Sequence, residues 1–90
     1  MTHNEVMQRL TEVFRDVFDD ESINIYDTTT ANDIEDWDSI EHINLIEAVE
    51  KEFNMQFQMR EVSSMKNVGE MADIVASRAQ EKKKKRGFFR

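Results

Sequence analysis

The chain has 90 residues, enough for one domain with a modest hydrophobic core. It contains no cysteine, which excludes disulfide bridges, thiolate metal sites and a cysteine nucleophile. Residues 1–81 hold all 19 acidic residues and only six of the 12 basic ones, a formal charge of −13. An acidic body of this kind repels nucleic acid and favours partners with basic surfaces.

No stretch approaches the roughly 18 consecutive apolar residues of a membrane span. The first ten residues also lack the apolar run of a secretory leader. We therefore expect a cytoplasmic protein with no integral membrane segment.

The first predicted helix covers about residues 3–19. Thr2 followed three residues later by Glu5 is a capping-box pattern, which marks a helix start. Apolar side chains then recur at helical spacing and should form one buried face: Val6, Leu10, Val13, Phe14, Val17 and Phe18.

Residues 22–37 show no helical period and predict a long loop, which is unusual in a small domain. We expect Ile25, Ile34 and Trp37 to pin this loop to the core. An isolated strand at residues 23–26 is the less favoured alternative, because no partner strand is evident.

A second helix is predicted from about Ser39 to Phe53. Asp38 followed by Glu41 reads as a second capping box, with Glu41 reaching back to the cap. Ser39 then lies in the first turn, where unpaired N–H groups and the helix dipole favour an attached phosphate.

Two apolar rows run along this second helix. One contains Leu45, Val49 and Phe53, and the other contains Ile40, Ile43 and Ile46. Either both rows pack against the first helix, or one of them lines a ligand cavity or faces a partner.

The remaining pattern predicts a short helix over about residues 59–63 and a last helix to about residue 79. Asn54 is expected to end the second helix in a left-handed conformation, and Asn67 with Glu70 reads as the cap of the last helix. Its inward residues should be Val68, Met71, Ala72 and Val75. The sequence therefore predicts an all-α, small four-helix bundle, with three long helices and one short, over residues 1–81.

Residues 82–90 form a basic tail, which we expect to be disordered in isolation. The tail either has no specific role or docks on an acidic partner or an anionic membrane.

The tripeptide Asp38-Ser39-Ile40 resembles the Asp-Ser-Leu signature of the acyl carrier protein family. The match continues without a gap to Phe53 and more loosely over residues 4–80. The resemblance implies a non-catalytic carrier for fatty-acid, polyketide or related biosynthesis. Its acyl groups would be thioesters on a 4′-phosphopantetheine arm that a phosphopantetheinyl transferase moves from coenzyme A to Ser39.

The resemblance also assigns roles to residues around this serine. Asp38 and Glu41 would meet arginines and lysines of an acyl-loading ligase or transferase and of synthase enzymes, while Ile40 and Ile43 supply the apolar part of the contact. The implied acyl pocket consists of Ile43, Ile46, Phe57, Met65 and Met71. The implied protein is a monomer without a metal site.

Asn44 stands where many fatty-acid carriers have glutamate, and Glu47 stands where an apolar partner-facing residue is frequent. Trp37 before the signature is compatible with carriers of polyketide or peptide assembly systems. We therefore expect a stand-alone, specialised carrier.

Other classes of function were weighed on the same residues. A hydrolase could use Ser39 and His42, which are close enough on a helix to touch, but no third group or oxyanion hole is evident. A calcium-binding EF-hand would put Glu41 where its loop requires glycine. Weak, loosely specific divalent-ion binding to the acidic surface is a further alternative. An unmodified adaptor that docks through the second helix is the remaining alternative.

Overall fold

Helices account for most of the computed structural model, which describes residues 1–79. The elements are α1 (His3–Phe18), a 3₁₀ turn (Ala31–Asp33), α2 (Ser39–Phe53), α3 (Met59–Ser64) and α4 (Val68–Arg78). No strand occurs in this part of the chain. The predicted all-α bundle of three long helices and one short is therefore confirmed, whereas the basic tail lies outside the described residues.

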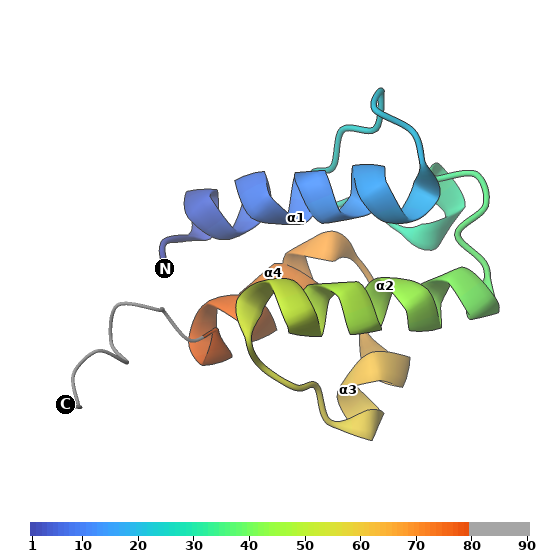
Figure 1. Cartoon of the computed structure of the whole chain (residues 1–90). Coiled ribbons are helices and arrows are strands. Elements are labelled where there is room, and N and C mark those ends of the chain that lie inside the picture. The colour runs from blue at the N-terminus through green and yellow to red at the C-terminus, as the bar shows by residue number, and fades with distance from the viewer. Residues whose placement is uncertain (80–90) are drawn as a thin grey trace, which may run out of the picture.

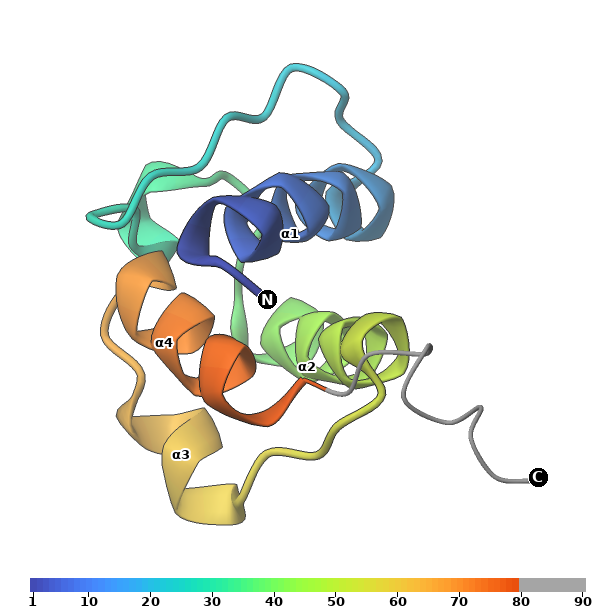
Figure 2. The ribbon, with the colours of Figure 1, turned by 90° about the vertical axis from the view of Figure 1, so that its left-hand side faces the viewer.

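The three long helices pack around one core (Figures 1 and 2). α1 and α2 run antiparallel, and α1 packs against both α2 and α4. α3 follows the α2–α3 connection and lies beside α2 and α4, away from α1. The fully buried side chains all come from α1, α2 and α4: Val6, Leu10, Phe14, Leu45, Val49, Phe53, Val68, Met71, Ala72 and Val75. Each predicted inward residue of α4 is among them.

Local side-chain chemistry fixes where the long helices begin and end. The Thr2 hydroxyl accepts the Glu5 N–H at 3.1 Å and the Glu5 carboxylate accepts the Thr2 N–H at 2.8 Å, so the predicted capping box is present. α1 stops at Asp19 and α2 stops at Asn54, both in the left-handed region with φ of 52° and 54°. Asp and Asn tolerate that conformation better than other side chains, which explains both ends.

The connection from α1 to α2 is a loop with more structure than its sequence indicated. Ile25 is buried, and Ile34 and Trp37 pack against the core as predicted, but Ile23 and Thr29 are also buried. The 3₁₀ turn inside the loop was not predicted.

The same loop satisfies the first N–H groups of α4. The Val68 N–H donates to the Thr29 carbonyl at 2.8 Å, and the Gly69 N–H donates to the Asp27 carbonyl at 2.9 Å. A Cβ at Gly69 would lie 2.9 Å from that Asp27 oxygen, so only glycine permits this close approach. The loop thereby fixes the start of α4, which borders the site described below.

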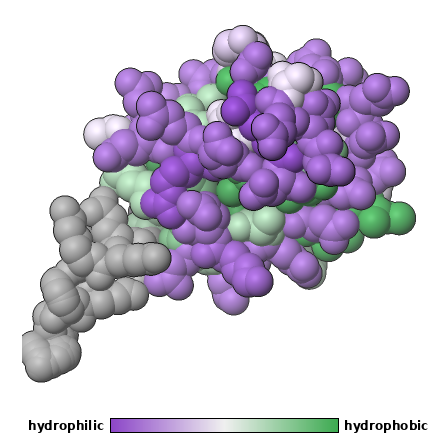
Figure 3. Space-filling model, turned by 45° about the horizontal axis from the view of Figure 1, so that its top comes forward, coloured by the Kyte–Doolittle hydropathy of each residue, from purple (hydrophilic) through white to green (hydrophobic). Residues whose placement is uncertain are grey.

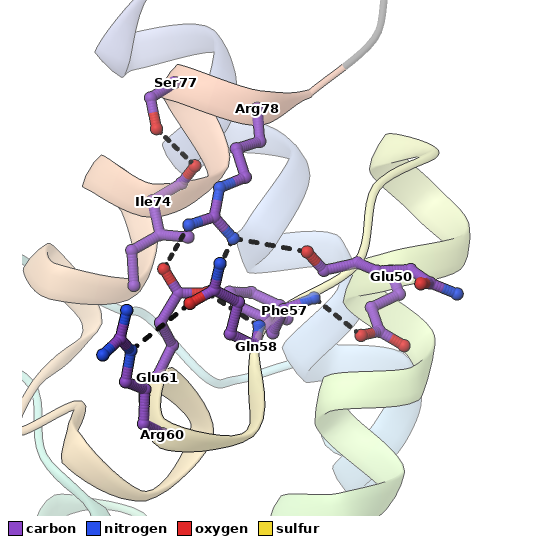
Figure 4. A network of polar contacts seen from close by, with 9 residues as sticks. Glu50, Phe57, Gln58, Arg60, Glu61, Ile74, Ser77 and Arg78 are labelled. Atoms are coloured by element: carbon purple, nitrogen blue, oxygen red, sulfur yellow. Dashed lines mark hydrogen bonds and ion pairs between the residues drawn. The ribbon is translucent and has the colours of Figure 1, made fainter.

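A polar network holds α3 against α4 and the α2–α3 connection (Figure 4). The Arg78 guanidinium forms a two-pronged ion pair with Glu61 and also donates to the Gln56 carbonyl at 3.4 Å. The Gln58 N–H donates to Glu61 at 2.8 Å, and the Phe57 N–H donates to Glu50 at 2.9 Å. Since α3 has only six residues, these contacts supply much of what keeps it in place.

This ion pair predicts a stability difference that depends on pH. The Arg78 hydrogen bond, then the Gln58 N–H, lowers the pKa of Glu61 from its ordinary value of 4.5. A carboxylate with a lowered folded-state pKa stabilises the fold above its unfolded pKa, and that stability is lost as the pH falls through the folded-state pKa. We expect wild type to be more stable than Glu61→Gln at pH 7 and this advantage to vanish in acid. Urea denaturation of both proteins across this range measures it, and a difference independent of pH would contradict the assignment.

Candidate functional site

Ser39 opens α2 and its side chain is exposed. The preceding residue, Asp38, caps the helix: its carboxylate accepts the Glu41 N–H at 2.9 Å. Within residues 1–79 the Ser39 hydroxyl has no hydrogen-bond partner. The cap therefore comes from Asp38, and the Ser39 oxygen stays available for chemistry.

The predicted capping boxes at α2 and α4 are only half formed. Glu41 does not reach back, because the Asp38 N–H donates instead to the Asp36 carbonyl at 2.9 Å, with Asp36 at a φ of 75°. Glu41 accepts from the Asn44 amide at 3.4 Å. At α4 the cap by Asn67 is present, as predicted, but the Glu70 carboxylate accepts the N–H of Lys66, one residue before the cap. Glu41 is thus left on the surface near Ser39.

A cavity of about 400 Å³ opens beside Ser39, between the start of α2, the end of α3 and the start of α4. Its lining combines apolar and polar side chains: Ala31, Trp37, Asp38, Ser39, His42, Val62, Ser63, Met65, Lys66, Asn67 and Met71. The volume falls within the range of small-ligand pockets. A group attached to Ser39 can therefore lie along this cavity.

Two of the five predicted pocket residues, Met65 and Met71, line this cavity. The other three lie outside its lining. Ile46 is buried in the core, Phe57 is half-buried on the α2–α3 connection, and Ile43 is 58% exposed. The structure thus brings together only part of the predicted pocket.

The predicted partner-facing residues are all at the N-terminal half of α2. Ile40 is 71% exposed and Ile43 is 58% exposed, whereas Leu45, Val49 and Phe53 are buried. The two apolar rows therefore differ in burial: all of the first row lies in the core, but only Ile46 of the second row does. Asp38 is exposed and Glu41 half-buried beside these isoleucines. Figure 3 shows a largely hydrophilic surface, with hydrophobic side chains at the right-hand edge, the side on which α2 begins in Figure 1.

A hydrogen-bonded triad that the sequence did not reveal forms one wall of the cavity. The Trp37 indole N–H donates to His42 Nδ1 at 3.0 Å, and His42 Nε2 lies 3.1 Å from the Val62 carbonyl. A neutral imidazole with its proton on Nε2 satisfies both contacts. Since Val62 belongs to α3, this triad ties the loop before α2 to α3.

The same contacts count against a hydrolase at this site. Both nitrogens of His42 are engaged, by Trp37 and by Val62, so neither is free to take the Ser39 proton. Within residues 1–79 no group of three or more His, Cys, Asp or Glu side chains is placed to hold a metal ion. The helices of this part of the chain also lack the length and apolar character of a membrane span.

Comparison with solved structures decides the family. The solution NMR structure of a holo acyl carrier protein from Geobacter metallireducens is 44% identical, with a TM-score of 0.76. The match covers 80% of this chain and 83% of that one. The chain belongs to the acyl carrier protein family. No protein-family model and no curated protein matches it.

Membership of the acyl carrier protein family gives the chain a carrier function and no catalytic one, as the resemblance implied. The 4′-phosphopantetheine group of this family needs an accessible hydroxyl and room beside it. The Ser39 hydroxyl is exposed and has no hydrogen-bond partner within residues 1–79, and the cavity adjoins it. Both needs are met, so the residues of this acyl carrier protein fit the group.

Proposed function

We propose that Ser39 Oγ is the attachment point of the 4′-phosphopantetheine arm, by which the chain carries acyl groups. The observation that carries this proposal is the exposed Ser39 hydroxyl, without a hydrogen-bond partner in the described chain, at the rim of the cavity. When attached, the arm supplies a thiol that forms thioesters with acyl groups. Asp38 caps α2 in place of Ser39, and the helix N-terminus stabilises an anion on the serine by roughly 0.3–1 kcal/mol.

We further propose that the cavity receives the start of the acyl chain. Met65 and Met71 line it, and unbranched thioether side chains adapt to ligands of varied shape. Ile46, another member of the predicted acyl pocket, is buried in the core and does not line the cavity. Ile43 and Phe57, the other predicted members of the acyl pocket, do not line the cavity in this structure.

The exposed start of α2 is the proposed docking surface for the transferase, the acyl-loading enzyme and synthases. Ile40 and Ile43 supply an apolar contact, and Asp38 and Glu41 attract basic side chains. Glu47 and Asn44 are exposed on the same helix and would alter this contact, which supports a stand-alone, specialised carrier.

Ile43→Ala tests the docking surface. If Ile43 is one of the few central residues that carry most of the binding energy, its truncation costs more than about 1 kcal/mol, so we expect kcat/KM of the transferase to fall roughly fivefold or more. Met59→Ala is the matched control, because Met59 is 86% exposed but does not line the cavity or lie on α2. Equal effects of the two substitutions would contradict the docking surface.

The proposed attachment is tested by intact-mass measurement after incubation with coenzyme A and a phosphopantetheinyl transferase of broad specificity. We expect the mass to rise by one phosphopantetheine group, and fragmentation to place that group on Ser39. No gain with several transferases would contradict the proposal and favour an unmodified adaptor that docks through α2.

A further inference from the structure

We propose that Lys66 is the positioning residue for the arm: its ammonium pairs with the phosphate on Ser39 and so directs the arm into the cavity. The inference rests on the proposed function, because that phosphate exists only if Ser39 carries the arm. Lys66 lies at the α3–α4 connection and lines the same cavity as Ser39. Among the lining residues that lie within residues 1–79, it is the only Lys or Arg.

In the described part of the chain, no carboxylate pairs with the Lys66 ammonium, which can therefore accept another anion. The arginines of the described chain are mostly engaged with carboxylates: Arg9 with Glu52, Arg15 with Glu12 and Arg78 with Glu61. Within residues 1–79 the Lys66 ammonium has no ion pair, although acidic residues outnumber basic ones about threefold there. Its backbone is held in place, because its N–H donates to the Glu70 carboxylate at 2.9 Å. The Lys66 backbone is therefore held in place, while its ammonium has no ion pair within residues 1–79.

The side chains around Ser39 explain why a cation such as Lys66 would stabilise a phosphate there. Asp38 precedes the serine and Glu41 follows within the first turn, so a phosphodiester on Ser39 adds an anion beside two carboxylates. The helix N-terminus offsets part of this repulsion. A lysine ammonium is a compact cation on a flexible stem and a common phosphate ligand. Pairing with Lys66 would offset this repulsion with a cation on the cavity that both Lys66 and Ser39 line.

The experiment compares the lysine side chains of the apo and arm-bearing full chain by NMR with ¹⁵N-labelled lysine. Intact mass first shows that each sample carries the arm. We expect the Lys66 Nζ resonance to shift when the arm is attached, and the Lys51 Nζ resonance to stay unchanged. Lys51 is the matched control, since it is exposed at the far end of α2 and also lacks an ion pair in the described chain.

Two variants distinguish an effect of the positive charge of Lys66 from an effect of its side-chain packing. In Lys66→Gln the ³¹P resonance of the arm should move away from its wild-type position, and contacts between the arm and Met65 should be lost from the NOE spectrum. Lys66→Arg should retain both signals because it keeps the cation.

An arm-bearing wild type with an unchanged Lys66 Nζ resonance would overturn the inference alone. A Lys66→Arg protein that behaves like Lys66→Gln would overturn it as well. A wild type that accepts no arm would instead overturn the proposed function.

Discussion

Ser39→Ala is expected to abolish loading completely while leaving the fold intact. Ser39 Oγ is the proposed attachment atom, and alanine offers no oxygen in its place. The hydroxyl makes no hydrogen bond within residues 1–79, and the helix cap belongs to Asp38. Substitution away from buried or capping groups changes the free energy of unfolding by about 0.5 kcal/mol or less. Intact mass after transferase treatment and urea denaturation measure the two effects.

Ser63→Ala is the matched control, because Ser63 is another serine exposed at the rim of the same cavity. It should accept the arm at the wild-type rate. Loading of the Ser39→Ala chain would show that a different residue carries the arm. A large loss of stability in that chain would show that the hydroxyl has a structural role.

Phe14→Ala is expected to lower the free energy of unfolding by about 3–5 kcal/mol, the usual cost of a deleted buried phenyl group. Phe14 is fully buried, and its ring meets the edge of Trp37 at a centroid distance of 5.3 Å. A domain of this size has roughly 5–15 kcal/mol of stability in total, so the loss is a large part of it. Because Trp37 forms a wall of the cavity, the substitution should also disturb the site. Urea denaturation measures the first effect.

Phe18→Ala, one turn later on α1, is the control. Phe18 packs on the same cluster, with its ring 6.0 Å from that of Phe14, but is only partly buried. Its replacement should cost clearly less. Equal losses would mean that Phe14 does not hold Trp37 and the core together in the way that its burial indicates.

The long helices could be predicted from the sequence because their signals are local. Apolar spacing and the Thr2 cap identify α1. The Asp38 cap, followed by apolar residues at helical spacing, identifies α2. The choice of Ser39 as the proposed attachment point likewise rests on the tripeptide Asp38-Ser39-Ile40 together with the amphipathic helix that follows it. Each of these inferences needs only neighbouring residues.

The contacts between distant segments could not be predicted in this way. The pairing of the α1–α2 loop with the start of α4 joins Asp27 to Gly69, which are far apart in the sequence. The triad of Trp37, His42 and Val62 similarly depends on the position of α3 in the fold, because Val62 belongs to α3. Ile43 was placed in the predicted pocket by the family resemblance, and the sequence does not say which members of a helical row lie against the core.

Trp37 is the one tryptophan in the chain, and it stands on the wall of the cavity next to the serine. Its ring stacks on His42 and donates a hydrogen bond to it, so its emission depends on what surrounds that pair. Whatever enters the cavity changes the polarity around the indole. The molecule therefore contains its own optical reporter, with which the arrival of an arm or an acyl chain can be followed in real time without a label.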